Sequence, residues 1–580
     1  MKIIRAILSR PYLTLLWTVV VLLLTLTPAV DMPLTPTWEL LSFDTAAHAA
    51  VFAVLAAVAW PWVRTWAARP GLVVLVGCVG LGALIEVLQY AMHQGRHAEW
   101  SDLLSDSIGV VVVLALIGLG RLGRNRLAGT AALLLAGALG ATAQPAPPRP
   151  TDAPDLARAR HTIEELASEK MHGRGYVKQG EHVAAAYLRD RLRQLGLQPL
   201  APDYTQSFTL DVNTFPGEMK LRLSHGYVPV LGPSQALRPG HDFIAEPTSS
   251  RGRLTGQRLR YLDSATLAST ASQQEFLRGR PIGIVVLLDH YSQQPSHLPT
   301  AISQRVDSAG AVLRVLPKLT ASLASHQGTQ LQLDILPQDM LHQFKPATTS
   351  PAWTADVQLD VQLQRSYQTQ NLAAVVRGTA QPDSFLVVSA HYDHLGMMGK
   401  NTYFPGANDN ASGVALLLEL AAHYARPENR PRYSVAFLLF GAEEAGLVGS
   451  SYFVQHPLVP LSHIKFLVNL DLLGTGEEGA TVVNGKVYET AFQRLTALNE
   501  AQHFLPKLGA RGRAANSDHY PFSEAGVPAF FMYTRGGSTA YHDVNDRPAA
   551  LSLAGFTGAY GLVRTFLDTL GAGPAKSPGR

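Results

Sequence analysis

The chain has 580 residues, of which 47% are hydrophobic and 16% are charged, so it is long enough for several domains and more apolar than most soluble proteins. Its one cysteine, Cys78, excludes an intrachain disulfide and a cysteine-based zinc site. The net charge of +4 comes from scattered basic residues and not from a basic stripe between aromatic residues, so we expect no nucleic-acid partner.

Long apolar runs are concentrated near the N-terminus. The runs without Asp, Glu, Lys or Arg are residues 11–30, 45–63, 71–85 and 108–120. Runs of this length can cross a bilayer, although the last needs its flanking residues to do so, and their succession favours membrane spans over buried core helices. Residues 1–126 are therefore predicted to form an all-α transmembrane bundle in the lipid bilayer.

Ionisable and polar residues recur within this region. Asp44 and His48 share a helix face at i and i+4. Further polar residues follow at Glu86, Gln89, Arg96 and Asp102, with Gly109 beyond them. This set resembles the VanZ-like family of bacterial membrane proteins, which implies a VanZ-like membrane module. Ionisable residues at membrane depth usually mark function, but they also pair simply to satisfy one another.

The flanking charges predict where the rest of the chain lies. Basic residues flank alternate ends of the apolar runs, with Arg96 as the exception, which places the N-terminus in the cytoplasm. Residues 127–150 then combine an apolar stretch, residues 127–143, with a Pro- and Ala-rich linker. The stretch has a basic start and an Ala-Thr-Ala end, so it is either a cleaved signal sequence or a fifth span. A multi-pass membrane protein is predicted, with the remainder of the chain in the periplasm or at the cell surface.

Two further regions precede the chemically informative part of the sequence. Residues 151–215 begin a new domain, in which residues 157–197 have amphipathic helical spacing. Residues 216–370 contain strand-like pieces at 282–288 and 311–316. They are predicted to form an inserted β-rich or α+β domain that acts as a lid or a substrate-selecting cap.

Residues 371–580 carry a series of polar motifs. These are SAHYDHLG (389–396), PGANDNASGVA (405–415), FGAEEAGLVGS (440–450), LVNLDLLG (467–474), SDHYPF (517–522) and AYHDVND (540–546). Apolar runs of strand length lie beside them, at residues 385–389, 435–440, 466–470 and 527–534. Continuous apolar runs are typical of parallel strands buried on both faces, and ligands gather at the carboxyl ends of such strands. The region is therefore predicted to be an α/β domain with a mostly parallel sheet and a site at one edge.

The residue types in these motifs indicate metal-assisted hydrolysis. Imidazole and carboxylate ligands without a thiolate suit zinc. A carboxylate that can bridge suits two ions a few ångströms apart. An isolated Asp or Glu at a strand end is usually a solvated loop residue, so the prediction depends on all the motifs occurring together.

The motifs resemble those of the co-catalytic di-zinc aminopeptidases, whose relatives include the glutaminyl cyclases. The resemblance covers roughly residues 157–215 and 371–570, and it implies the zinc exopeptidase fold with two zinc ions per chain. It implies that one zinc is held by His391 and Asp471, that the other is held by Glu444 and His542, and that Asp409 bridges both. In this family an inserted region such as 216–370 often resembles the protease-associated domain.

The resemblance also implies roles for residues around the ions. Glu443 is expected to be the general base that takes a proton from the attacking water. Asp393 lies two residues after His391, so in an extended segment its carboxylate can orient the imidazole. Tyr541 is expected to donate a hydrogen bond to the developing oxyanion. Relatives carry a cis peptide after the bridging aspartate, so a cis bond is expected between Asp409 and Asn410.

The function predicted from the sequence is a membrane-tethered, extracytoplasmic zinc aminopeptidase that acts on peptides through a metal-activated water. One alternative is a glutaminyl cyclase-like acyltransferase, which uses the same fold with one zinc. Another is a catalytically silent binding or signalling protein whose membrane module carries the function. Metal content and the release of free amino acids separate these possibilities.

Overall fold

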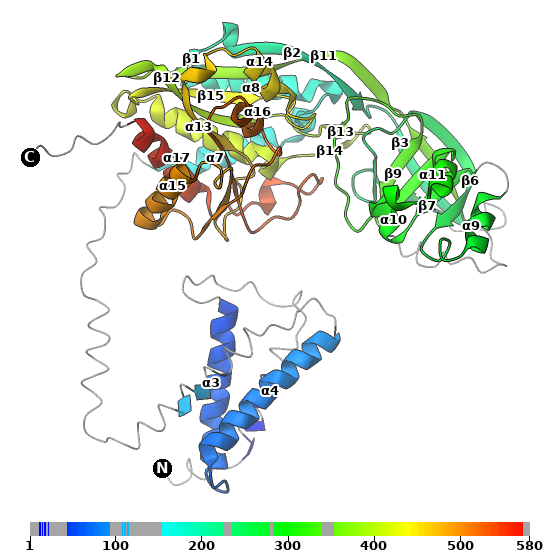
Figure 1. The fold of residues 1–580 in the computed structure, drawn as a ribbon, viewed down its shortest axis with the longest axis vertical. Coiled ribbons are helices and arrows are strands. Elements are labelled where there is room, and N and C mark those ends of the chain that lie inside the picture. The colour runs from blue at the N-terminus through cyan, green and yellow to red at the C-terminus, as the bar shows by residue number, and fades with distance from the viewer. Residues whose placement is uncertain are drawn as a thin grey trace, which may run out of the picture. The chain divides into compact units, whose positions relative to one another are not determined.

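The computed structural model describes residues 43–92, 153–225, 234–278, 282–337 and 353–571, with single residues between 11 and 21 and between 107 and 114. The chain divides into two compact units, Met1–Gln144 and Pro145–Arg580. Figure 1 shows helices α3 and α4 in the first unit and the two larger sheets with their helices in the second.

The first unit is described mainly by two helices, α3 (Phe43–Val63) and α4 (Pro70–Met92). Phe52 and Leu55 of α3 share a buried cluster with Val74 and Cys78 of α4. The apolar runs that suggested membrane spans therefore supply the surfaces by which these helices pack together.

The transmembrane prediction is contradicted. Within the described residues, no helix is long and apolar enough to cross a membrane. The predicted transmembrane bundle in the bilayer is therefore wrong for this part of the chain, and so is the multi-pass localisation that depended on it. Several predictions lie outside the described residues: the signal-like segment 127–143, most of the runs 11–30 and 108–120, and Arg96, Asp102 and Gly109 of the VanZ-like resemblance.

The larger sheet of the second unit holds the motif-bearing strands. Its strands are β1 (Gln198–Pro199), β2 (Thr205–Thr214), β11 (Gln362–Val376), β12 (Gln381–His391), β15 (Tyr433–Phe440), β16 (Ile464–Leu470), β17 (Ala480–Val483), β18 (Leu508–Ala510) and β19 (Ala529–Thr534). The order is β1-β11-β15-β12-β16-β19-β17-β18, with β2 paired to β11. The central strands β15, β12, β16 and β19 are parallel, whereas β11 and β17 join them antiparallel. The predicted parallel strands are thus confirmed at the centre of a mixed sheet.

Helices cover both faces of this sheet (Figure 1). One face packs against α7 (Leu156–Leu166), α8 (Gly180–Gln194), α13 (Gly413–Tyr424), α15 (Glu489–Gln502) and α17 (Phe556–Gly571), and the other against α14 (Val448–Gln455) and α16 (His519–Glu524). In β12, Leu386 and Val388 face the first group, and Phe385 and Val387 face the second. Because successive side chains of a strand point to opposite faces, a continuous apolar run is needed to build both cores.

The segment predicted to be helical, 157–197, forms two helices with an irregular connection. Asp155 caps α7 by accepting a hydrogen bond from the Arg158 backbone N–H, which satisfies a free donor of the first turn. Between α7 and α8 lie the short helical turns η3 (Glu169–Arg174) and η4 (Val177–Gln179). This connection reaches the loops of the metal motifs, because the Gly173 carbonyl accepts from the Gly396 N–H at 3.0 Å.

A second sheet lies within the predicted insert 216–370. Its strands are β3 (Met219–His225), β4 (Ser234–Leu237), β5 (Phe243–Ala245), β6 (Gly252–Leu262), β7 (Ile284–Leu287), β8 (Ala311–Val315), β9 (Leu331–Ile335) and β10 (Trp353–Leu359), with helices α9 (Thr270–Leu277), α10 (Asp289–Gln293) and α11 (Thr300–Asp307). The order is β4-β3-β10-β6-β7-β8-β9-β5. Its core also takes in Leu395, Phe404 and Val544 from the motif loops of the first sheet. The insert therefore shares a core with the loops that carry the site.

Candidate metal centre

The parallel strands bring the motif residues to one edge of the sheet. His391 ends β12 and is paired in register with Phe440, the last residue of β15. Glu443 and Glu444 follow β15 after a short turn, and Asp471 follows β16 directly. These side chains meet because the carboxyl ends of parallel strands lie together.

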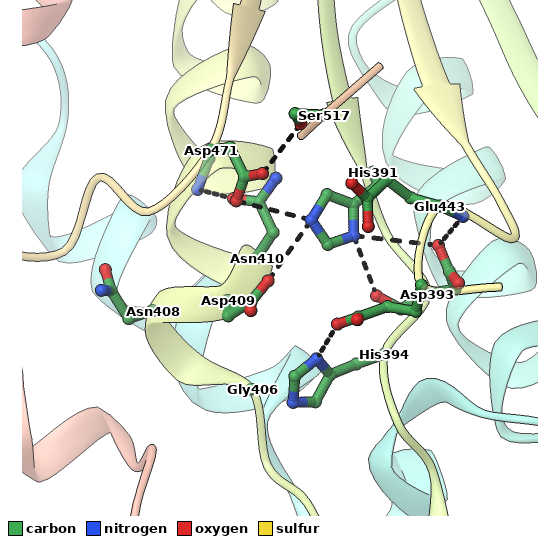
Figure 2. Close-up of polar contacts among 12 residues, drawn as sticks. His391, Asp393, His394, Gly406, Asn408, Asp409, Asn410, Glu443, Asp471 and Ser517 are labelled. Carbon is green, nitrogen blue, oxygen red and sulfur yellow. Dashed lines mark hydrogen bonds and ion pairs between the residues drawn. The ribbon is translucent and has the colours of Figure 1, made fainter. Parts of the chain in front are cut away.

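The first cluster forms around His391, which is buried. Its Nε2 lies 3.3 Å from Asp409 Oδ1 and 3.4 Å from Asp471 Oδ1. Figure 2 marks contacts of His391 with dashed lines. The other oxygen of Asp471 accepts a hydrogen bond from the Ser517 hydroxyl at 2.9 Å. Asp471 Oδ1 is a buried oxygen without a hydrogen-bond partner among the described residues. A buried oxygen of this kind is suited to a cation.

The second cluster forms around His542. Its Nε2 lies 3.2 Å from Asp409 Oδ2 and 3.1 Å from Glu444 Oε2. Asp409 therefore directs one oxygen to His391 and the other to His542. A carboxylate divided in this way between two imidazoles is the arrangement that a bridging ligand requires.

Both imidazoles are oriented by backbone carbonyls. His542 Nδ1 lies 2.8 Å from the Ala321 carbonyl oxygen, in the insert, and His391 Nδ1 lies 3.2 Å from the Asp393 carbonyl oxygen. Because a carbonyl can only accept, each Nδ1 carries the proton, and in the neutral ring each Nε2 lone pair faces carboxylate oxygens. Lone pairs in that arrangement repel unless a cation or a proton lies between them.

The spacing and the chemistry of these side chains fit zinc. Ligand atoms of His391, Asp409 and Asp471 lie within 4.8 Å of one another, as do those of His394, Asp409 and Glu444. Nitrogen and carboxylate donors without thiolate are a zinc ligand set. Without a metal, the carboxylates of Asp471, Glu443 and Asp409 outweigh the effect of burial and raise the pKa of His391 well above its usual value.

The loop around Asp409 is held tightly. The Asp546 carboxylate accepts hydrogen bonds from the backbone N–H groups of Asn408 at 2.9 Å and Asp409 at 3.0 Å. Asn410 donates to the Leu470 carbonyl at 2.9 Å, which ties the loop to the end of β16. The peptide bond between Asp409 and Asn410 is cis, so that prediction is confirmed.

The adjacent glutamates differ in their electrostatics. Burial, together with the charges of Asp518 and Glu444, raises the pKa of Glu443 well above its usual value. Burial also opposes ionisation of Glu444, but His542 and His394 outweigh it and lower the pKa of Glu444 to about 2. Two neighbouring carboxyl groups with pKa values pushed apart are typical of a divided role.

Asp393 and Tyr541 stand beside these clusters. Asp393 is fully buried, and its Oδ1 accepts from the Glu443 backbone N–H at 3.1 Å and lies 3.8 Å from His391 Nδ1. The Asp393 side chain therefore anchors the glutamate loop, while its backbone carbonyl orients the imidazole. The Tyr541 ring stacks on the His542 ring at 3.9 Å between centroids, and the residue is 49% exposed.

Two groups of the site were not predicted as ligands or catalytic groups: His394, which was expected to pack or to support a ligand, and the Ala321 carbonyl. His394 Nδ1 lies 2.7 Å from Glu444 Oε1, so it contacts a candidate ligand directly. The sequence feature that could have indicated this contact is that His394 lies in the same motif as His391. The Ala321 carbonyl carried no signal, because any residue supplies a backbone oxygen.

Part of the chain is similar to known proteins. Residues 371–566 match the model of Peptidase family M28. The chain is 37% identical over 198 residues to an aminopeptidase of Pseudomonas aeruginosa, covering 32% of this chain and 35% of that protein. It is 32% identical over 169 residues to Aminopeptidase YwaD of Bacillus subtilis, covering 27% of this chain and 34% of that one. The chain thus spans about a third of the length of these relatives.

Solved structures show the same fold. The zinc aminopeptidase BSAP from Bacillus subtilis superposes with a TM-score of 0.50 at 20% identity, over 72% of this chain and 95% of that one. A peptidase M28 precursor from Shewanella amazonensis superposes with a TM-score of 0.51 at 15% identity, over 73% of this chain and 99% of that one. Residues 371–566 are therefore similar to peptidase family M28, and the unit that contains them has the fold of these solved structures.

Proposed function

We propose that the protein is a zinc aminopeptidase that uses two zinc ions to remove N-terminal residues from peptides. The observation that carries the proposal is Asp409, whose oxygens face His391 and His542 separately at 3.3 and 3.2 Å. A single-metal site, as in the glutaminyl cyclase alternative, does not need a carboxylate shared between two imidazoles. The matches to proteins named aminopeptidase support the same reaction class.

In the proposed mechanism, the residues divide into ligands, a base and a donor. Zinc ions, when bound, supply the Lewis acidity that polarises a peptide carbonyl and activates water. Glu443 accepts the proton of the attacking water at its carboxylate and passes it to the leaving amine. Tyr541 donates from its hydroxyl to the oxyanion that develops on the carbonyl oxygen. Asp393 keeps Glu443 in place through the backbone N–H of that residue.

Two matched peptides test this proposal. They have one sequence, with a free N-terminus in one and an acetylated N-terminus in the other, and the products are identified by mass spectrometry. We expect stepwise loss of N-terminal residues from the free peptide only, and loss of this activity after metal chelation. Cleavage inside the acetylated peptide would contradict an aminopeptidase.

A third peptide that begins with glutamine separates the alternatives. A glutaminyl cyclase would convert it to the cyclised form with loss of ammonia and without release of an amino acid. The proposal predicts release of free glutamine. A silent binding protein would leave all three peptides unchanged.

A further inference from the structure

Arg174 is a fully buried arginine at the end of η3, in a part of the chain that precedes the family match. The mechanism above does not use it. A buried charge is strongly unfavourable unless it is paired and its hydrogen-bonding capacity is filled. The partners of its guanidinium therefore show what the residue does.

All the guanidinium donors are used, and every acceptor is a backbone carbonyl. Nε donates to Tyr392 at 2.8 Å, Nη1 to Leu166 at 2.8 Å and to Pro405 at 2.7 Å, and Nη2 to Gly406 at 2.8 Å and to Asp409 at 3.1 Å. Tyr392 follows His391 directly in the sequence, and Asp409 is the candidate bridging ligand. One side chain thus joins the backbone of the two loops that supply His391 and Asp409.

Two side chains form hydrogen bonds with the backbone of the Asp409 loop. Arg174 binds its carbonyl groups, while the Asp546 carboxylate binds the N–H groups of Asn408 and Asp409. The geometry also depends on Gly406, which has a φ of 59°. A Cβ there would lie 2.2 Å from the Asp409 carbonyl oxygen and 2.6 Å from Arg174 Nη2. Only glycine leaves room for this close approach.

The backbone next to Arg174 reinforces the contact. The Arg174 carbonyl accepts from the His394 N–H at 3.1 Å, and the Gly173 carbonyl accepts from the Gly396 N–H at 3.0 Å. The guanidinium also stays positive at neutral pH: burial lowers the pKa of Arg174 only to about 10, because Asp409, Asp546, Asp393 and Glu444 oppose the effect of burial. A permanent positive charge therefore lies beside the acidic cluster.

We propose that Arg174 is a positioning residue that fixes the His391 and Asp409 loops relative to each other, so that both side chains can hold the same metal ion. The inference rests on the proposed zinc site. It predicts that removing the guanidinium weakens zinc binding even though Arg174 is not a ligand. Partners that orient ligands are typically worth about 10- to 100-fold in metal affinity.

The test compares Arg174→Met, Arg174→Lys and the control Arg158→Met. Arg158 lies in the same N-terminal part of the domain and donates from Nε to Oε1 of Glu419 in α13 at 2.7 Å, and Glu419 is not a candidate ligand. Zinc affinity is measured by chelator competition on metal-free protein, and folding of the same metal-free samples by circular dichroism and urea unfolding. We expect zinc affinity to fall about 10- to 100-fold in Arg174→Met. Arg158→Met should lose stability without losing affinity.

Arg174→Lys keeps the positive charge. The lysine ammonium group is compact, so it cannot form hydrogen bonds with all the backbone carbonyls that the guanidinium contacts. We expect an affinity between those of wild type and Arg174→Met, and this variant decides the question if Arg174→Met does not fold. Wild-type affinity in a folded Arg174→Lys would overturn the proposal. Failure of both variants to fold without metal would also overturn it, since Arg174 would then support the fold in general. Absence of zinc binding by the wild-type protein would instead overturn the proposed function.

Discussion

At the residue scale, Glu443 and Glu444 share a loop but have different surroundings. Glu444 has both oxygens engaged, Oε1 with His394 at 2.7 Å and Oε2 with His542 at 3.1 Å. Glu443 is placed through its backbone N–H, which donates to Asp393. The first arrangement suits a ligand, and the second leaves a carboxylate available for proton transfer.

Glu443→Gln should keep both zinc ions and lose turnover. Glutamine keeps the size and the backbone hydrogen bond but cannot accept the proton from water. The loss in kcat should be about 10²- to 10⁴-fold, the usual contribution of general acid–base catalysis. The check is zinc stoichiometry beside kcat, and loss of zinc without loss of kcat would refute the assignment.

Glu444→Gln should behave in the opposite way. The change replaces a charged oxygen that faces His542, so one zinc should bind more weakly and activity should return in part with added zinc. Zinc analysis with and without dialysis, together with turnover over a zinc titration, measures this. Two tightly held ions in this variant, together with loss of zinc from Glu443→Gln, would mean that base and ligand are exchanged.

Tyr541→Phe tests the proposed oxyanion donor. Partial burial and the nearby carboxylates of Asp409 and Glu444 raise the pKa of Tyr541, so its hydroxyl stays protonated and able to donate at neutral pH. Phenylalanine preserves the stacking on His542 and removes only the hydroxyl. We expect kcat to fall about 10²- to 10³-fold with little change in KM, as for other oxyanion donors. Steady-state kinetics give both constants, and an unchanged kcat would leave Tyr541 with a packing role.

At the element scale, the insert contacts the candidate metal centre. The Ala321 carbonyl accepts from His542 Nδ1 at 2.8 Å, and the Ala321 N–H donates to the His542 carbonyl at 3.1 Å. Nearby, Lys318 Nζ donates to the Thr539 carbonyl at 2.7 Å. The loop that carries these residues, 318–324, therefore holds His542 from outside the larger sheet.

Ala321→Pro should weaken the zinc site that includes His542. Proline removes the N–H that binds the His542 backbone, and zinc affinity should fall by about 10- to 100-fold, as for other groups that orient ligands. Lys318→Met is the matched control, because its contact is exposed and does not touch His542. Chelator competition on both variants gives the affinities. Equal losses in the two variants would argue against a specific role for the Ala321 contact.

The elements that could be predicted from sequence are those with a distinctive pattern. β12, β15, β16 and β19 were predicted because strands buried on both faces have continuous apolar runs. The antiparallel strand β11 was not, because its first half is largely exposed and lacks such a run. The candidate ligands could be named because their motifs resemble those of the di-zinc aminopeptidases. The role of Arg174 could not be predicted from the sequence. Its acceptors are backbone carbonyls, and every residue type has one.

At the scale of the whole molecule, the two units differ in how well the sequence predicted them. In Pro145–Arg580, polar motifs and apolar strands favoured the same α/β fold. In Met1–Gln144, apolar runs, flanking basic residues and a VanZ-like resemblance suggested membrane spans. Apolar runs by themselves do not distinguish a span from a helix that packs on another helix. The finding that no described helix can cross a membrane corrects that prediction.

The most direct test of the account is a zinc titration of metal-free protein, with bound zinc measured by elemental analysis and release of the N-terminal residue from a free peptide followed in the same samples. The account predicts two zinc ions per chain at saturation and full aminopeptidase activity only when both are bound. Saturation at one zinc ion per chain with full activity, or saturation at two with no release of N-terminal residues, would contradict it.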